Sequence, residues 1–325
     1  MVLGVTAGDS CGIGPEVLLK AFTLGEIKHP VVIYGDIDIL DYYSNFLGYQ
    51  VPLIRAAEPL QHREGWLNVI DAGILRREHL TIGRVNRESG KAARGYVVSA
   101  ARDALAGRIE AIVTLPLSKE ATQLSDPGFI GHTELIGELC GVKDVTIMLA
   151  SDQLIVTHVS THVSLTAAIG LVKKERICTI ISLTYEALRK IKPQPRVAVA
   201  GLNPHAGENG LFGDQESREI QPAVEWARSH GMPVEGPFPP DTVFYLAVHR
   251  KRFDAVVCMY HDQGHIPLKL LDFEGGVNVA LGLPIIRTSV DHGTAFDIAG
   301  QGVASTRSFL RALDLAARLS ALDHV

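Results

Sequence analysis

The sequence has no run of five like charges and few aromatic side chains. Its 31 basic and 36 acidic residues give a formal net charge of -5, and aromatics make up 6% of the 325 residues. Nucleic-acid binding proteins concentrate positive charge or stacking aromatics on one surface, so this class of protein is disfavoured. A hydrophobic content of 46% indicates instead a compact, enzyme-sized chain, long enough for two domains or one large α/β unit.

Cysteines are also sparse, and no two of them form a C-x-x-C pair. Cys11, Cys140, Cys178 and Cys258 therefore fit reduced core thiols of a cytoplasmic protein better than a disulfide framework or a thiolate zinc site. The first residues, MVLGVTAGDS, lack the basic segment of a signal peptide, and no apolar run approaches about 18 residues. We therefore expect a cytoplasmic location, with neither a secretion signal nor a membrane span.

The two common nucleotide-binding glycine motifs are missing. No G-x-G-x-x-G follows a strand pattern, and no G-x-x-x-x-G-K-[ST] occurs. A different glycine-rich segment, TAGDSCGIGPE, precedes an apolar helical pattern, with Pro15 suited to a first helical turn. This turn could bind an anion or could simply connect a strand to a helix.

Short β-branched runs alternate with helical patterns along the chain. The periodicity predicts helices over 89–106, with Ser89 as a possible N-cap and a stripe of Val97, Ala101 and Leu105, and over 173–190. Such alternation predicts an α/β fold with a largely parallel sheet. The expected strands span 31–34, 109–115, 145–150, 196–202 and 254–260.

Polar, small-residue-rich segments follow three of the expected strands: TLPLSKE, NPHAGE and YHDQGH. Ligands of open α/β sheets bind at the carboxyl ends of strands, so these segments predict one shared site. Three histidines are candidate metal ligands. His205 and His261 lie in two of these segments, and His162 lies in the separate segment STHVS. The alternative for each is a histidine hydrogen-bonded in a turn, and His158 or His265 could substitute as ligands.

Other polar residues in these segments are candidates for catalysis or substrate binding. Asp241 and Asp262 could be metal ligands, orient an imidazole or accept hydrogen bonds, although Asp241 could also cap a helix. A set of cations and neutral donors among glycines, prolines and apolar residues suits a buried phosphate. It comprises Lys119, His132, Thr133, Lys269, Asn278 and Arg287. For the two lysines the alternative is an ordinary surface lysine with a buried stem.

Taken together, the motifs resemble the PdxA family of 4-hydroxythreonine-4-phosphate dehydrogenases and their relatives. The resemblance runs in order along nearly the whole chain, and NPHAGE and MYHDQG are its most specific parts. The other segments are GDSCGIGPE, TLPLSKE, GHTE, STH, PPDT, GVNVALGLPIIRTS and DHGTAFDIAG. The last of these also looks like the cofactor loop of isocitrate and isopropylmalate dehydrogenases, which lack the Rossmann glycines.

The resemblance implies two α/β/α domains around a central cleft, as in isocitrate and isopropylmalate dehydrogenases. One domain would comprise residues 1–130 and 285–325 with the cofactor loop. Residues 131–284 would form the other, with the metal ligands and the interface of a homodimer that has shared active sites. We expect no nucleic acid or membrane as a partner.

The family's site residues carry over to positions of this sequence. The resemblance implies a divalent metal, Zn, Mg, Mn or Co, bound by His162, His205 and His261, with His162 reaching the site from the partner subunit. Substrate contacts are implied for His132, Thr133, Lys269, Asn278 and Arg287. Asp241, Asp262 and Lys119 are the candidate catalytic bases. Cofactor contacts would come from His292, Gly293, Thr294, Ala295 and Asp297.

The implied activity is a metal-dependent oxidation, linked to NAD or NADP and followed by decarboxylation. Its substrate would be a 4-phosphorylated four-carbon hydroxy acid: D-threonate or D-erythronate 4-phosphate, or 4-phosphooxy-L-threonine. The alternative outside the family is a metal-dependent sugar-phosphate hydrolase or aldolase that uses no nucleotide. Within the family, the alternative is a cis-dihydrodiol dehydrogenase.

Overall fold

The computed structural model describes residues 2–56, 62–142 and 144–321. The chain divides into two compact units, each an α/β layer structure. Unit 1 comprises residues 1–143 and 283–325, and unit 2 comprises residues 144–282. Within the described segments, no helix is both long and apolar enough to cross a membrane.

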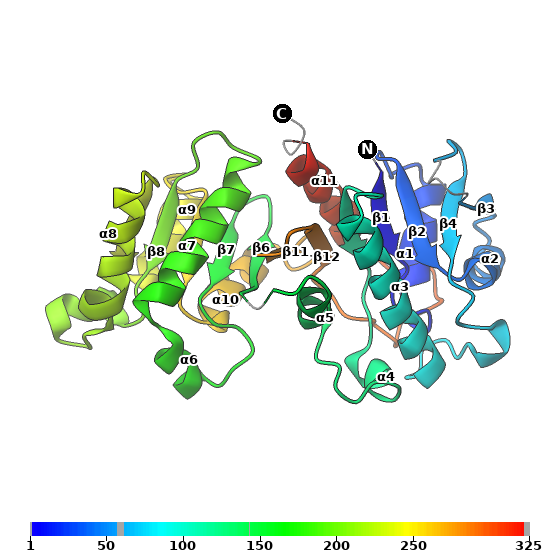
Figure 1. Ribbon diagram of the computed structural model, residues 1–325, viewed down its shortest axis with the longest axis horizontal. Helices are drawn as coiled ribbons and strands as arrows, with labels where there is room; N and C mark the ends of the chain where they lie inside the picture. Colours follow the sequence, from blue (N-terminus) through cyan, green and yellow to red (C-terminus); the bar gives the residue numbers. More distant parts are fainter. Residues whose placement is uncertain (1, 57–61, 143, 322–325) are drawn as a thin grey trace. The chain divides into compact units, whose positions relative to one another are not determined.

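Unit 1 contains a parallel sheet with the strand order β3-β4-β2-β1-β5-β12 (Figure 1). The central strands β1 and β5 are fully buried because the run of each is apolar on both faces, as parallel strands covered by helices require. The strands are β1 (Leu3–Thr6), β2 (Val31–Gly35), β3 (Leu53–Arg55), β4 (Leu67–Asp71), β5 (Ala111–Thr114) and β12 (Ile286–Val290).

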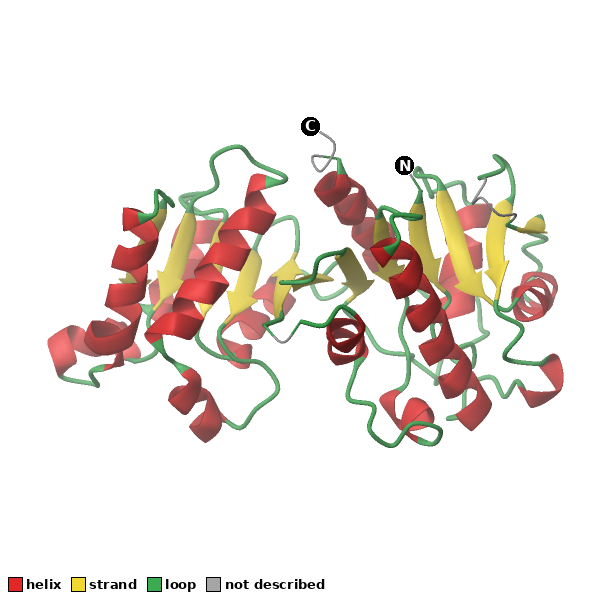
Figure 2. Cartoon of the chain, in the orientation of Figure 1, coloured by secondary structure: helices red, strands yellow, loops and turns green. Residues whose placement is uncertain are grey.

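The helices of unit 1 connect these strands and cover the sheet (Figure 2). They are α1 (Gly14–Thr23), α2 (Ile37–Phe46), α3 (Arg87–Leu105), α4 (Lys119–Gln123), α5 (His132–Leu139) and α11 (Arg307–Ser320). The amphipathic helix α5 packs through Leu135 and Ile136 on Val97 of α3. Residues 131–143 therefore belong to unit 1, whereas the sequence had suggested unit 2.

The sheet of unit 2 is mixed, in the order β11-β6-β7-β10-β8-β9. Strand β6 is antiparallel to both β7 and β11, and the pairs from β7 to β9 are parallel, so only part of this sheet has the expected direction. Its strands are β6 (Thr146–Ala150), β7 (Ile155–His158), β8 (Val197–Ala200), β9 (Val234–Phe238), β10 (Ala255–Cys258) and β11 (Val277–Leu281).

Alternate residues of β8 and β10 enter two separate hydrophobic cores in unit 2. Val199 and Val257 pack with helices α7 and α8, whereas Ala198 and Val256 pack with α9 and α10. Each face of the sheet is thus covered by helices (Figure 2). The helices are α6 (Leu165–Leu171), α7 (Lys174–Arg189), α8 (Gln221–Ser229), α9 (Pro240–Val248) and α10 (His261–Leu271).

The predicted strands and the helix over 173–190 are present; the strand over 31–34 is one residue longer, and the others have shorter bounds. The start of α3 differs, because Asn86 accepts hydrogen bonds from the backbone N–H groups of Glu88 and Ser89, so Asn86 is the N-cap. Ser89 lies inside the helix, and Leu105 is exposed at its end. All four cysteines are free thiols; three are buried and Cys140 is partly exposed.

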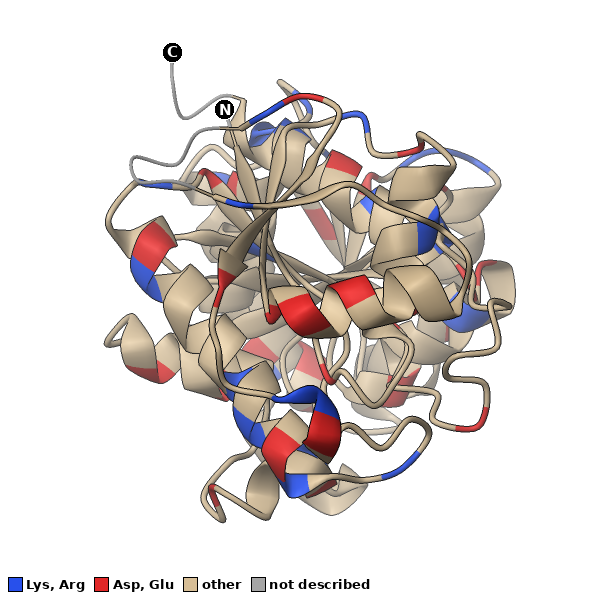
Figure 3. Cartoon of the chain, turned by 90° about the vertical axis from the view of Figure 1, so that its right-hand side faces the viewer, with Lys and Arg blue, Asp and Glu red and all other residues tan. Residues whose placement is uncertain are grey.

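Figure 3 shows Lys and Arg interspersed with Asp and Glu along the ribbon of the described residues. This distribution agrees with the formal net charge of -5. It gives no support to a nucleic-acid surface, which would require a concentrated basic patch.

Candidate functional site

A buried guanidinium occupies the centre of the candidate anion site in unit 1. Arg287 of β12 is only 3% exposed, and its Nε and Nη2 atoms donate hydrogen bonds to Thr114 Oγ1 at 3.2 and 2.7 Å. Thr114 is the last residue of the neighbouring parallel strand β5, and Arg287 is the second residue of β12, so the carboxyl end of β5 holds the arginine side chain. Burial lowers the pKa of Arg287 to about 10, a value at which the side chain is still cationic near neutral pH.

His132, the first residue of α5, lies in the electrostatic field of this arginine. Burial lowers the pKa of His132 well below its usual value, and the charges of Arg287 and Lys119 lower it further. Its Nε2 atom is buried without a hydrogen-bond partner in the described structure. A neutral imidazole with an unsatisfied nitrogen next to two cations suits a ligand that is anionic and carries hydrogen-bonding oxygens.

The structure thus brings together three of the predicted substrate residues, His132, Arg287 and Lys119. Lys119 is the exposed first residue of α4, and Thr133 is half-buried in the first turn of α5. Sequence reasoning missed Thr114, which orients the arginine. Its position as the polar last residue of an apolar strand, just before PLSK, was the available signal.

Two of the three predicted metal ligands lie close together in unit 2. The ring centres of His162 and His261 are 5.6 Å apart, and both residues line a cavity of about 300 Å³. Two imidazoles that share a tetrahedral zinc have ring centres roughly 5 Å apart, given the usual Zn–N distance. His162 lies in a loop, four residues beyond the end of β7.

Asp262 follows His261 at the start of α10 and contacts it directly. Its Oδ1 atom lies 2.6 Å from Nδ1 of His261, while the Asp262 side chain is 67% exposed. A carboxylate in this position fixes the tautomer and orientation of the ring and leaves Nε2 for a ligand. This contact supports the imidazole-orienting role among those considered for Asp262.

Two further histidines, His158 and His265, lie beside His261. His265 stacks on His261 with ring centres 3.5 Å apart, and its Nδ1 atom lies 3.2 Å from Nε2 of His158. Burial lowers the pKa of His158 to about 3, and the nearby charge of His265 adds to the effect. These two histidines therefore support the His261 ring, and their mutual contact leaves them poorly placed as substitute ligands.

His205 lies in an unusual turn, Pro204–Gly210. Residues 205–209 all have positive φ, including 53° at His205, a conformation that non-glycine residues adopt mainly where structure or function enforces it. The buried Glu216 holds the base of the turn by accepting hydrogen bonds from the backbone N–H groups of Leu202 and Asn203, both at 2.7 Å. Sequence reasoning missed Glu216.

Across the described ranges, no three or more His, Cys, Asp or Glu side chains are grouped to hold a metal ion. The His162 and His261 pair fits metal binding by its ring separation, but His205 is not grouped with it. The ring centre of His205 lies 6.1 Å from that of Phe212.

Three further candidates of unit 2 are on separate elements. Asp241 is exposed in the first turn of α9 and does not serve as its N-cap. The Nζ atom of Lys269, on α10, lies 5.4 Å from the centre of the Phe273 ring. Asn278 of β11 has a buried Oδ1 atom that lacks a partner in the described structure, as expected of a ligand contact.

The five candidate cofactor residues lie in unit 1, in the segment 291–306, which has no regular secondary structure. His292 has a buried Nε2 atom without a partner within the described part of the chain, and Ala295 has a positive φ of 43°. Gly293 and Asp297 are exposed, and the Thr294 carbonyl accepts a hydrogen bond from Ile13 N–H. The segment therefore has exposed residues and a backbone hydrogen bond that holds it in place.

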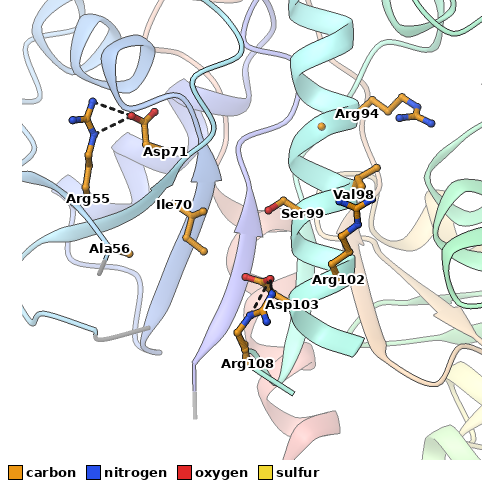
Figure 4. Close-up of a pocket in the computed structure, with 11 residues that line it drawn as sticks. Arg55, Ala56, Ile70, Asp71, Arg94, Val98, Ser99, Arg102, Asp103 and Arg108 are labelled. Atoms are coloured by element: carbon orange, nitrogen blue, oxygen red, sulfur yellow. Dashed lines mark hydrogen bonds and ion pairs between the residues drawn. The ribbon is translucent and has the colours of Figure 1, made fainter. Parts of the chain in front are cut away.

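A groove of about 1160 Å³ over α3, β3 and β4 contains none of the predicted residues (Figure 4). Its arginines are largely neutralised by carboxylates. Arg55 forms an ion pair with Asp71, Arg108 with Asp103, and Arg94 with Asp126 outside the groove lining. Because these arginines are already paired with carboxylates, the volume of the groove alone is no evidence that it is the active site.

Comparison with known proteins gives the same assignment as the motifs. Residues 26–316 match the family model described as pyridoxal phosphate biosynthetic protein PdxA. The chain belongs to the PdxA family. It is 44% identical to the D-threonate 4-phosphate dehydrogenase of Cupriavidus necator, over 98% of this chain and 97% of the relative.

Other PdxA relatives carry a second activity in their names. The chain is 45% identical to the 4-hydroxythreonine-4-phosphate dehydrogenase of Desulfosudis oleivorans, over 97% of this chain and 95% of the relative. A crystal structure of 4-hydroxythreonine-4-phosphate dehydrogenase from Klebsiella pneumoniae is similar with a TM-score of 0.89 and 42% identity, over 98% and 99% of the two chains. As a PdxA family member, the chain is an oxidoreductase.

Proposed function

We propose that this protein oxidises a 4-phosphorylated four-carbon hydroxy acid, with NAD or NADP as the electron acceptor and with loss of CO2. The observation that carries the proposal is the buried Arg287 with His132 and the exposed Lys119 beside it, in a PdxA family member. D-Threonate or D-erythronate 4-phosphate is our preferred substrate, because relatives of similar identity over the full chain carry D-threonate 4-phosphate in their names.

The cluster supplies what a phosphate monoester requires. Arg287 is held by Thr114 through two of its N–H groups, so the remaining N–H groups of its guanidinium are available to phosphate oxygens. Among the ion pairs of the described residues, none includes Arg287, although the Glu134 carboxylate is near enough to favour its charged form. A buried cation that no carboxylate contacts directly favours an anionic ligand. Lys119 adds a second positive charge at the exposed side.

The proposed reaction also requires a divalent metal, for which the histidines of unit 2 are the candidate ligands. His162 and His261, with His205 as the third ligand, would hold the ion, and Asp262 would keep the His261 ring oriented. When bound, such an ion acts as a Lewis acid that lowers the pKa of a coordinated hydroxyl and stabilises a neighbouring enolate.

Side chains of this protein would accept the proton that the oxidation releases. Asp241, Asp262 or Lys119 would accept the proton of the substrate hydroxyl as hydride leaves the same carbon. Oxidation of the hydroxyl at carbon 3 places a ketone β to the carboxylate. The resulting 3-oxo acid loses CO2, so decarboxylation follows from the oxidation product.

Exposed apolar side chains support a homodimer with shared sites. Each segment that carries a candidate metal ligand is flanked by them: Leu165 is 61% exposed beyond His162, Leu211 is 73% exposed beyond His205, and Leu270 is 84% exposed on the helix of His261. These three exposed leucines are available to an interface between chains. A second copy of the chain that covers these segments would bring one more histidine to each metal.

The resemblance assigned the partner's contribution to His162. The separation of 5.6 Å between His162 and His261 within one chain supports the alternative in which His162 serves its own chain. We therefore propose His205 as the ligand from the other chain.

A substrate panel tests the proposed reaction. Threonine, D-threonate and D-erythronate, each phosphorylated at position 4, would be tested with NAD and with NADP while the absorbance of the reduced nicotinamide is followed. A chelator control tests the metal. We expect turnover of the D-threonate or D-erythronate ester that stops with chelator, and no turnover of the unphosphorylated acids. Release of phosphate or cleavage of the carbon chain without nucleotide would favour the hydrolase or aldolase alternative.

A further inference from the structure

The segment 291–306 of unit 1 depends on other elements for its shape. It joins β12 to α11 without regular secondary structure, and its internal backbone hydrogen bonds are confined to 295–301. A connection of this length loses much conformational entropy when it is ordered, so contacts from outside must hold it.

Two charged side chains of helix α1 contact the second half of this segment. The Nζ atom of Lys20 donates hydrogen bonds to the carbonyl oxygens of Gly302 and Ala304, at 3.2 and 2.9 Å. The Oε1 atom of Glu16, a fully buried residue, accepts a hydrogen bond from Ala304 N–H at 2.7 Å. Both backbone polar groups of the buried Ala304 are thus satisfied by α1.

The glycine-rich turn before α1 holds the first half of the segment. Ile13 N–H donates to the Thr294 carbonyl at 3.0 Å, and a Cβ atom on Gly12 would lie 2.7 Å from the same oxygen. Gly12 therefore allows the close approach that the hydrogen bond needs. The turn and the first two turns of α1 together contact the segment near both of its ends.

We propose that α1 and its glycine turn form a clamp that holds residues 291–304 in the conformation that binds the nucleotide. Glu16 and Lys20 are then positioning residues for the cofactor. This inference rests on the proposed function, because it assigns these residues to the nucleotide part of the same site. Dinucleotide affinity scales with the fraction of molecules in which the segment is already ordered, so loss of the clamp weakens binding without the loss of a cofactor contact.

The test compares the wild type with Lys20→Met, with the conservative Lys20→Arg, and with Lys28→Met as the matched control. Lys28 is an exposed lysine that donates a hydrogen bond to the nearby Gly25 carbonyl. The measurements are NAD and NADP dissociation constants by calorimetry, the KM for the acid phosphate, and hydrogen exchange of the 291–304 amides without ligand. Lys20→Met should weaken nucleotide binding about tenfold, the effect of losing roughly 1.4 kcal/mol of hydrogen bonding.

Lys20→Met should also speed amide exchange at 299–304 and leave the KM for the acid unchanged. Lys20→Arg should recover most of the affinity, and Lys28→Met should match the wild type. Unchanged exchange and unchanged nucleotide affinity in Lys20→Met would overturn the clamp, as would an equal loss of acid and nucleotide affinity. A wild type that binds neither nucleotide would refute the proposed function, and the exchange data would still decide whether Lys20 holds the segment.

Discussion

Arg287 and His132 illustrate how burial shapes the proposed phosphate site. Burial of an arginine costs free energy unless its donors are satisfied, and Thr114 satisfies only part of the guanidinium. The same burial, together with the cations of Arg287 and Lys119, keeps His132 neutral. The site is therefore cationic through Arg287 and Lys119, while His132 offers an uncharged imidazole.

The lowered pKa of His132 predicts how stability depends on pH. In the unfolded chain the histidine titrates near its usual pKa of 6.5, but in the folded chain the proton binds only at lower pH. The neutral imidazole therefore contributes stability that is fully present above pH 6.5 and declines as the pH falls below it. We expect the wild type to lose more stability than His132→Asn between about pH 7.5 and about pH 5.

Urea unfolding of both proteins at the two pH values, without ligand, measures this difference. Exposed His230 on the C-cap of α8 offers a control, because His230→Asn should keep the pH dependence of the wild type. If His132→Asn loses as much free energy of unfolding on acidification as the wild type, the histidine is not held neutral by its surroundings.

At the scale of elements, five of the twelve strands of the described residues were predicted, because continuous β-branched runs leave little choice there. The runs over 31–34 and 254–260 became β2 and β10 with nearly the same bounds. The turn Pro204–Gly210 was not predictable, since His205, Ala206 and Glu208 carry no local signal for positive φ. Its conformation depends on Glu216, a contact made only in the folded chain.

The same distinction applies to the site. The histidine segments could be found by composition and by family resemblance, but the pairing of His162 with His261 depends on how β7 and β10 lie in register. Likewise, the meeting of Arg287 with Thr114 follows from the pairing of β12 with β5. Such convergence between distant strands is a property of topology, which the local periodicity of the sequence does not contain.

Substitution of His162, His205 and His261 tests directly whether two chains share each metal site. Each histidine would be changed to alanine, and the inactive variants mixed in pairs under conditions where subunits demonstrably exchange. If His205 comes from the partner, mixtures of His205→Ala with either other variant regain activity and bound metal, because one site in each heterodimer keeps all three ligands. The His162→Ala and His261→Ala mixture should stay inactive.

Other patterns would assign the ligands differently. Activity in the mixtures of His162→Ala with each other variant, and inactivity of the mixture of His205→Ala with His261→Ala, would show that His162 is the residue contributed by the partner, as the family resemblance implied. Inactivity of all three mixtures, with exchange verified, would contradict a shared site of any kind.

For the whole molecule, the two units carry different parts of the proposed chemistry. Unit 1 contains Arg287, His132 and Lys119 and the segment 291–306. Unit 2 contains the candidate metal ligands His162, His205 and His261. A reaction that needs a phosphate site, a nucleotide site and a metal site therefore requires the complete chain. A hydrolase or an aldolase would not require the segment that α1 and the glycine turn hold in place.

The most direct test is the ratio of CO2 released to nicotinamide reduced when the purified protein acts on D-threonate 4-phosphate. The two products would be measured in the same reaction, with and without a chelator. We expect equal amounts of CO2 and reduced nucleotide, and neither product when the metal is removed. Consumption of the acid phosphate without nucleotide reduction, or reduction without CO2, would contradict the oxidative decarboxylation proposed for this site.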